Sequence, residues 1–278
     1  MSPWNAHHYL KFGDERTQPA VDLASRIEIA NPKTVIDLGC GPGNSTQVLR
    51  GRWPDARLTG LDRSPEMIAA ARASYPEQDW VVASLETWLA PEPFDVVFSN
   101  AALQWIGNHD RLVTHLLAQV AHGGVLAFQI PSQHYSALRA HIEDVADDAA
   151  WRPRMQEAKA ALTMENPSYY YDALADQVRR LDIWETEYNH VMEGPESIVD
   201  WISSTGLRPF LDALDTDAER TRFVDLLNRK VAASYLRRRD GKVLFPFRRL
   251  FVVAYRDLKD VVHCVERATG GARQGGDQ

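Results

Sequence analysis

The chain has 278 residues, of which 45% are hydrophobic and 25% are charged, and its formal net charge is −7. These proportions are ordinary for a globular protein and exclude a disordered or collagen-like chain. The balance of 38 acidic against 31 basic residues argues against a broad electrostatic surface for nucleic acid or anionic membrane. The length predicts one α/β core with a sizeable insertion.

The two cysteines, Cys40 and Cys264, lie far apart and show no metal-ligand spacing, so we expect no metal and a reducing, cytoplasmic compartment. No stretch approaches the run of about eighteen apolar residues typical of a transmembrane helix. The first eleven residues lack the apolar core of a signal peptide. The sequence gives no indication of the oligomeric state.

Short apolar runs alternate with amphipathic stretches between residues 34 and 130, which is typical of a parallel sheet covered by helices on both faces. The predicted strands are 34–38, 57–62, 79–83, 94–99 and 125–130. Ser64 and Pro65 predict a helix that begins directly after the second strand. Gly123 and Gly124 are expected to end the helix before the fifth strand. The apolar positions of the helices before the first and fifth strands are Ala20, Leu23, Ala24, Ile27, Leu112, Val113, Leu116, Leu117 and Val120.

In the second half of the chain, the predicted strands and helices no longer alternate regularly. Residues 131–181 are predicted to be helix-rich, with breaks at Pro153 and Pro167, and are followed by a strand at 187–192. Residues 195 to about 236 predict a second helical stretch, and residues 247–255 predict the last strand. Beyond Glu266 the chain is polar and glycine-rich, which is typical of a disordered tail. We therefore expect four parts: a capping segment (1–30), a ligand-binding core (31–130), helical insertions with the last two strands (131–256), and a tail (257–278).

A glycine-rich turn follows the first predicted strand, in the run Val35-Ile36-Asp37-Leu38-Gly39-Cys40-Gly41-Pro42-Gly43-Asn44. In an open parallel sheet, ligands bind at the carboxyl ends of the strands, and glycines there allow a close approach to the backbone. Asp62 ends the second strand 25 residues after Asp37, where a carboxylate can accept both hydroxyls of a ribose.

A nicotinamide dinucleotide site is the alternative reading of this turn. The dinucleotide pattern is G-x-G-x-x-G, whereas the third glycine here, Gly43, falls one residue early. Asp37 would repel a pyrophosphate, but it suits a cofactor with an ammonium group and a sulfonium cation. The turn therefore favours a cofactor with an ammonium group and a sulfonium cation over a nicotinamide dinucleotide.

The runs D-L-G-C-G-P-G-N-S-T, G-L-D-R-S-P-E-M and F-D-V-V-F-S-N-A-A-L-Q-W resemble the class I S-adenosylmethionine-dependent methyltransferases. The resemblance implies a doubly wound, mostly parallel seven-stranded Rossmann-like sheet with helical lid insertions. It also implies that S-adenosylmethionine is bound by the glycine turn and by residues after the next strands. The implied cofactor residues are Asp37 at the amino group, Gly39, Cys40, Gly41 and Gly43 along the methionine part, Asp62 at the ribose, Arg63, Met67, Ser84 and Leu85 at the adenine, and Asn100 and Ala101 after the fourth strand.

The run from His8 to Leu23 and the run Ser204-Thr205-Gly206-Leu207-Arg208-Pro209-Phe210-Leu211 resemble the trans-aconitate 2-methyltransferases. This resemblance implies methylation of one carboxylate of trans-aconitate, giving a monomethyl ester and S-adenosylhomocysteine. Arg208 is expected to be held inward by a turn at Pro209 and Phe210. The implied substrate residues are His8, Tyr9, Arg16, Trp105, Tyr169 and Arg208. Further arginines and tyrosines that a tricarboxylate could use are Tyr170, Tyr171, Arg179, Arg248 and Arg249.

A carboxylate is ionised at pH 7, so its methylation requires no general base, and we expect positioning to account for catalysis. Three alternatives stay open. Another small acceptor, such as a phenol, an amine or a different acid, would fit the same core. A nucleic-acid methyltransferase is disfavoured because Asn100 is followed by Ala101-Ala102-Leu103 instead of the Pro-Pro-aromatic run of amino-methyltransferases. A cofactor-binding protein without turnover is the third alternative.

Overall fold

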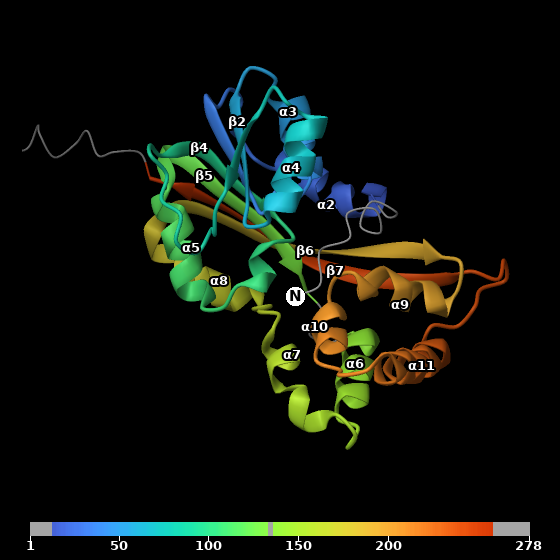
Figure 1. The fold of residues 1–278 in the computed structure, drawn as a ribbon. Coiled ribbons are helices and arrows are strands. Elements are labelled where there is room, and N and C mark those ends of the chain that lie inside the picture. Colours follow the sequence, from blue (N-terminus) through green and yellow to red (C-terminus); the bar gives the residue numbers. More distant parts are fainter. Residues whose placement is uncertain (1–12, 133–135, 258–278) are drawn as a thin grey trace, which may run out of the picture.

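The computed structural model describes residues 13–132 and 136–257, which form a seven-stranded sheet with helices on both faces (Figure 1). The strand order is β3-β2-β1-β4-β5-β7-β6. β7 runs antiparallel to both of its neighbours, β5 and β6, and all other strand pairs are parallel. The strands are β1 (Thr34–Leu38), β2 (Arg57–Asp62), β3 (Asp79–Val82), β4 (Phe94–Asn100), β5 (Val120–Pro131), β6 (Val178–Met192) and β7 (Val243–Arg256). The predicted fold class is confirmed.

Each face of the sheet carries its own apolar core. On one face, α2 (Gly13–Ser25) and α3 (Asn44–Arg52) pack through Leu23, Leu49 and Trp53 against β1 and β4. Beside them lies α4 (Pro65–Ser74), above β2 and β3 (Figure 1). On the other face, α5 (His109–Ala118) and α8 (Pro167–Leu174) pack against β4, β5 and β7. Because both faces are covered, the buried positions of the central strands are mostly apolar, as predicted for a parallel sheet.

A third core lies beyond the sheet, around the outer ends of β6 and β7, and the helices around it occupy the lower part of Figure 1. It contains Trp151, Trp201, Phe223 and Phe245. Its helices are α6 (Ala137–Ala146), α7 (Gln156–Ala160), α9 (Pro195–Ser203), α10 (Arg208–Asp212) and α11 (Asp217–Ser234). Three short 3₁₀ helices, η1 (Leu103–Trp105), η2 (Arg152–Arg154) and η3 (Ala175–Gln177), connect these elements. We call α6, α7, α9, α10 and α11 the helical region.

The glycine pair before the fifth strand does not end a helix, so that prediction is wrong. α5 ends at Ala118, and Gly123 and Gly124 lie inside β5, where the register against β4 shifts between Phe94 and Val96. Gly123 has a φ of 78°, and a Cβ at Gly124 would lie 2.7 Å from the Asp95 carbonyl oxygen. The two glycines therefore allow a bulge and a close backbone approach.

Three other predicted boundaries also differ from the structure. β6 begins at Val178, so residues 178–181 are strand where a helix was predicted; their charged side chains lie on an edge strand. β7 begins at Val243, four residues before the predicted start. The predicted helical stretch 195–236 is divided into α9, α10 and α11. By contrast, α4 begins as predicted, with Ser64 Oγ accepting a hydrogen bond from the N–H of Met67.

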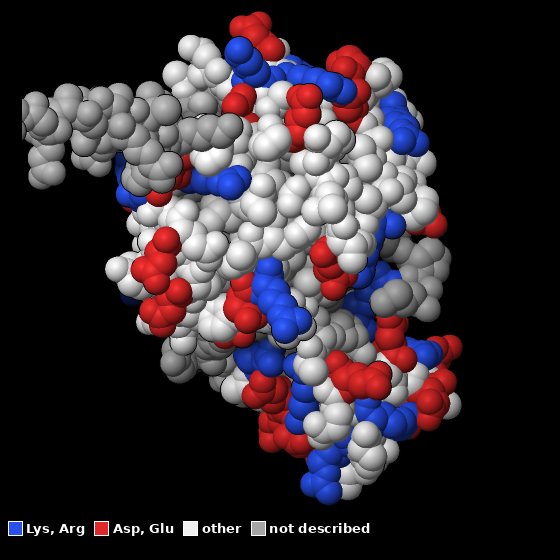
Figure 2. Space-filling view, turned by 90° about the vertical axis from the view of Figure 1, so that its left-hand side faces the viewer, with Lys and Arg blue, Asp and Glu red and all other residues white. Residues whose placement is uncertain are grey.

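Basic and acidic side chains are interspersed on the face that Figure 2 presents. In the helical region, ion pairs join neighbouring helices and turns, including Arg154 with Glu219 at 2.6 Å and Lys159 with Asp147 at 2.7 Å. Among the described residues, no helix is both long and apolar enough to cross a membrane, and no group of three or more His, Cys, Asp or Glu side chains is arranged to bind a metal.

Candidate active site

The glycine turn after β1 is strongly bent, because Gly39, Gly41 and Gly43 all have positive φ values (71°, 54° and 98°). The N–H groups of Gly39 and Cys40 donate to the Leu61 carbonyl at 2.7 and 3.0 Å, which fixes the turn against the end of β2. A Cβ at Gly39 would lie 2.2 Å from Ala102 Cβ, and one at Gly43 would lie 2.9 Å from the Trp80 ring.

Gly41 differs from the other two glycines of the turn. A Cβ built on Gly41 would have no described heavy atom within 4 Å. Gly39 and Gly43 are therefore required by the packing of the protein itself. Gly41 presents its backbone to open space at the carboxyl edge of the sheet, where a ligand can approach it.

Asp62, at the end of β2, is bonded to the backbone on both sides. Its Oδ2 accepts a hydrogen bond from Gly41 N at 2.9 Å, and its Oδ1 accepts one from Ser64 N at 2.9 Å. A carboxylate oxygen can accept more than one hydrogen bond, so both oxygens keep capacity for ribose hydroxyls. The backbone contacts are a role that the sequence analysis did not predict: Asp62 also shapes the glycine turn.

Asp37 is completely buried beneath the turn. Its Oδ2 accepts hydrogen bonds from Ser45 Oγ at 2.6 Å and Thr46 Oγ1 at 2.7 Å, both in the first turn of α3. Burial raises the pKa of the Asp37 carboxyl to about 6, against the lowering effect of the two hydroxyls, and the charge of Asp62 raises it further. Its Oδ1 makes no hydrogen bond to any described residue. This buried acceptor fits a nearby cationic donor such as an ammonium group.

The remaining cofactor candidates on the first three strands differ in exposure. The Cys40 side chain is buried against Ile68 and Trp80, its Sγ donates to the Gly41 carbonyl at 3.5 Å, and burial raises the pKa of its thiol. Met67 and Leu85 are buried at 5% and 8% exposure. Arg63 is exposed, and Ser84 Oγ donates to Glu86 at 3.1 Å.

The segment after β4 adopts a strained conformation. Ala101 has a φ of 54°, which is unfavourable for a residue with a Cβ. Its N–H donates to the Gln129 carbonyl at 2.9 Å, and its own carbonyl accepts from Gln104 Nε2 at 2.7 Å. Asn100 Oδ1 is buried and makes no hydrogen bond to a described residue. Trp105, in η1, is half-buried.

One hydrogen bond joins this segment to the chain after α7, which in turn lies near Gly206, before α10. The N–H of Thr163 donates to the Gln104 carbonyl at 2.8 Å, and Leu162 lies 3.8 Å from the position of a Cβ at Gly206. Arg208, two residues after Gly206, begins helix α10 instead of standing in a turn, so the predicted turn is wrong. Its Nε lies 3.6 Å from Asp212 Oδ2, one helical turn away.

The three consecutive tyrosines have three different environments. The Tyr169 hydroxyl accepts from the N–H of Asp110 at 2.9 Å, at the start of α5. Tyr170 is completely buried and bonds to His109 Nδ1 at 2.5 Å, while His109 Nε2 bonds to the Leu103 carbonyl at 2.9 Å. Burial lowers the pKa of His109. Tyr171 is 58% exposed. Neither His109 nor this connection from α8 to η1 was predicted, and no local pattern in the sequence indicates it.

The other candidate arginines are spread over the molecule. Arg179 lies over the ring of Tyr255, whose strand partner is the amino-terminal part of β5. Arg248 pairs with Glu187 at 3.3 Å, and both side chains are nearly half exposed. Arg249 is 4% exposed and lies next to Gln129. His8 and Tyr9 lie outside the described residues. Arg16 lies in α2, and its side chain is outside the description.

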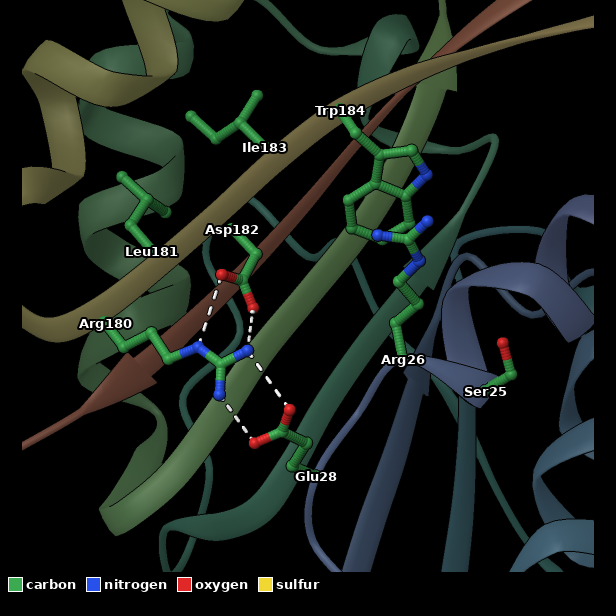
Figure 3. Close-up of a pocket in the computed structure, with 8 residues that line it drawn as sticks. All are labelled: Ser25, Arg26, Glu28, Arg180, Leu181, Asp182, Ile183 and Trp184. Atoms are coloured by element: carbon green, nitrogen blue, oxygen red, sulfur yellow. Dashed lines mark hydrogen bonds and ion pairs between the residues drawn. The ribbon is translucent and has the colours of Figure 1, made fainter.

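A pocket of about 600 Å³ lies away from this edge, between the end of α2 and β6 (Figure 3). Its wall includes Arg180, which pairs with Glu28 and Asp182, and Arg26, which stacks over Trp184. In the sheet register, Arg180 of β6 lies opposite Tyr255 of β7. Tyr255 in turn lies opposite Val125, in the amino-terminal half of β5. The pocket therefore lies toward the amino ends of the parallel strands, away from the glycine turn.

The sheet order, the reversed β7 and the glycine turn opposite Asp62 define a class I S-adenosylmethionine-dependent methyltransferase, and a methyltransferase-domain family model matches residues 35–124. The chain belongs to the trans-aconitate 2-methyltransferase family. A protein of that name from Rhodopseudomonas palustris (strain BisA53) is 42% identical over 255 residues, which are 91% of this chain and 99% of that protein. Another, from Azoarcus sp. (strain BH72), is 41% identical over 92% of this chain and 100% of its own length. The crystal structure of the YcgJ protein from Bacillus subtilis is similar in fold, with a TM-score of 0.58 and 14% identity over 86% of this chain and 99% of that one.

Proposed function

We propose that this protein methylates one carboxylate of trans-aconitate. The observation that carries the proposal is identity of 41 to 42% to trans-aconitate 2-methyltransferases over nine-tenths of this chain and almost all of theirs. When bound, S-adenosylmethionine supplies an activated methyl group, and the reaction gives a monomethyl ester and S-adenosylhomocysteine. The acidic surface balance also suits a small-molecule acceptor better than a nucleic acid.

The cofactor would lie along the carboxyl edge of β1, β2 and β4. Gly41 allows the methionine part to approach the backbone, and Asp62 accepts the ribose hydroxyls while it fixes Gly41. Asp37 supplies negative charge beneath the turn for the ammonium group. Arg63 and the buried Met67 would flank the adenine, and Ser84 and the buried Leu85 would meet its edge.

The acceptor would lie beyond Asn100, Ala101 and Trp105, beneath the helical region. Its carboxylates are ionised at neutral pH, so the residues around it need to orient one oxygen and exclude water instead of removing a proton. Arg16 and Arg208, with His8, Tyr9 and Tyr169 near the entrance, are the proposed contacts. The hydrogen bond between Thr163 and Gln104, and the position of Leu162 near Gly206, support a lid role for the helical region.

The second candidate function is methyl transfer to a different small acid, a phenol or an amine. The Trp105 ring, half-buried after β4, favours it, because an aromatic acceptor could stack there. The protein should be incubated with S-adenosylmethionine and a panel of such acceptors, and the products analysed by mass spectrometry. Methylation of trans-aconitate at the highest kcat/KM supports the proposal; a higher value for a phenol or an amine contradicts it.

A further inference from the structure

Arg249 is a buried cation at the carboxyl edge of the sheet. It is only 4% exposed and stands on β7 opposite Pro131, the last paired residue of β5. Its guanidinium lies 4.8 Å from the centre of the Phe247 ring, and Nη1 donates to Gln129 Oε1 at 3.3 Å. The aromatic ring and the amide hold the planar fork in one orientation.

Gln129 connects this arginine to the proposed methyl-transfer site. It is completely buried, pairs with Asn100 across the β4–β5 ladder, and its carbonyl accepts the N–H of the strained Ala101. Its Oε1 is occupied by Arg249, which assigns Nε2 as the second, donating side of the amide. Among the described residues, Nε2 makes no hydrogen bond, and neither does Asn100 Oδ1 beside it. The buried amide of Gln129 and the guanidinium of Arg249 thus lie together. Gln129 is in turn bonded to Ala101, in the segment after β4 that borders the proposed methyl-transfer site.

We propose that Arg249 and Gln129 bind a carboxylate of the acceptor and so determine the preference for polycarboxylates. This inference rests on the proposed function. A guanidinium and an amide N–H are both donors, and together they match the two oxygens of a carboxylate. A carboxylate bound by Arg249 and Gln129 would hold one end of the acceptor on the rigid sheet. Arg208 would contact the acceptor from the helical region.

The test compares Gln129→Glu and Arg249→Lys with the control Arg248→Lys, a neighbouring arginine that is half exposed and pairs with Glu187. Gln129→Glu is nearly isosteric and places a negative charge beside Arg249, which repels an incoming carboxylate. Arg249→Lys keeps the charge and loses the fork. Binding of trans-aconitate is measured by calorimetry in the presence of S-adenosylhomocysteine, with the KM for trans-aconitate and the melting temperature measured in parallel.

We expect Gln129→Glu to weaken trans-aconitate binding on the order of thirty-fold to several hundred-fold, without loss of cofactor affinity or melting temperature. Arg249→Lys should weaken it less, and Arg248→Lys should bind as the wild type does. Wild-type affinity in both Gln129→Glu and Arg249→Lys overturns the inference. A wild type that binds trans-aconitate without methylating it contradicts the proposed function alone, and a wild type that does not bind it contradicts both.

Discussion

The N–H of Gly41 donates a hydrogen bond to Asp62 Oδ2 at 2.9 Å, which joins the turn after β1 to the end of β2. These are the two positions where the cofactor is expected to contact the protein. Asp62 fixes the backbone of the turn, and in the proposed site it would also accept the ribose hydroxyls. Loss of its carboxylate should therefore affect both parts of the cofactor site.

We predict that Asp62→Ala weakens S-adenosylmethionine binding by about one to two orders of magnitude, because charge-assisted hydrogen bonds to the ribose and to the turn are lost. Isothermal calorimetry on the folded variant measures this. The matched control is Glu66→Gln, which removes a nearby acidic charge in the first turn of α4, where Glu66 accepts a hydrogen bond from Ser64 Oγ and makes no contact with Gly41. An unchanged affinity in Asp62→Ala would remove Asp62 from the site.

Two glycines of the same turn should respond differently to substitution. Gly41→Val should leave a folded protein that does not bind the cofactor, because the side chain would enter open space that the ligand needs; the φ of 54° at this position should also cost it some melting temperature. Gly39→Ala should chiefly lower the melting temperature, because its Cβ would collide with Ala102 at 2.2 Å. Calorimetry and thermal unfolding on both variants separate the two effects. Normal binding by Gly41→Val would show that the turn is only structural.

The buried Asp37 should make cofactor binding dependent on pH. Its pKa is raised to about 6 in the protein alone, and a neighbouring ammonium group favours the ionised form. Binding at pH 6 should therefore release up to about half a proton, and affinity should rise as the pH increases through 6. Calorimetry in buffers of different ionisation enthalpy measures the proton count. A binding enthalpy that is the same in all buffers would contradict the role of Asp37.

The same group should affect stability in the opposite direction. Because its pKa is higher in the folded chain than in the unfolded chain, its contribution to stability is fully present below about pH 4 and is lost as the pH rises through 6. Asp37→Asn keeps acceptors for Ser45 and Thr46 but cannot ionise. Urea unfolding of the cofactor-free protein should show a loss of stability between pH 4 and 6 in the wild type relative to Asp37→Asn.

The acceptor prediction concerns Arg16 and Arg208. If each binds a carboxylate, replacement by Ala should raise the KM for trans-aconitate about thirty-fold to several hundred-fold while cofactor affinity stays nearly constant. A monocarboxylate should be penalised less. Asp212→Ala is the control for Arg208, because it removes the ion pair and keeps the arginine. The prediction is contradicted if Arg208→Ala and Asp212→Ala both lose a little stability and neither changes the KM. Arg208 would then only stabilise helix α10.

The sequence predicts the geometry of the glycine turn and of Asp62 well, because its signals are local. Gly39, Gly41 and Gly43 stand on one turn, and Asp62 ends the adjacent parallel strand, so strand order alone brings them together. The helical region is less predictable. Its core depends on how far β6 and β7 extend beyond the sheet, and the charged start of β6 at Val178 lacks the apolar run of a buried strand. The cluster of Arg249 and Gln129 joins residues 120 positions apart through the β5–β7 register, which no local pattern specifies.

The most direct test of the account is methyl transfer from isotopically labelled S-adenosylmethionine to a series of mono-, di- and tricarboxylates. We expect one label per molecule in an alkali-labile ester of trans-aconitate, with kcat/KM decreasing as carboxylates are removed from the acceptor. We also expect Gly41→Val to abolish incorporation. Incorporation that is independent of the number of carboxylates, or a labelled product that resists mild alkali, would contradict the assignment as a trans-aconitate methyltransferase.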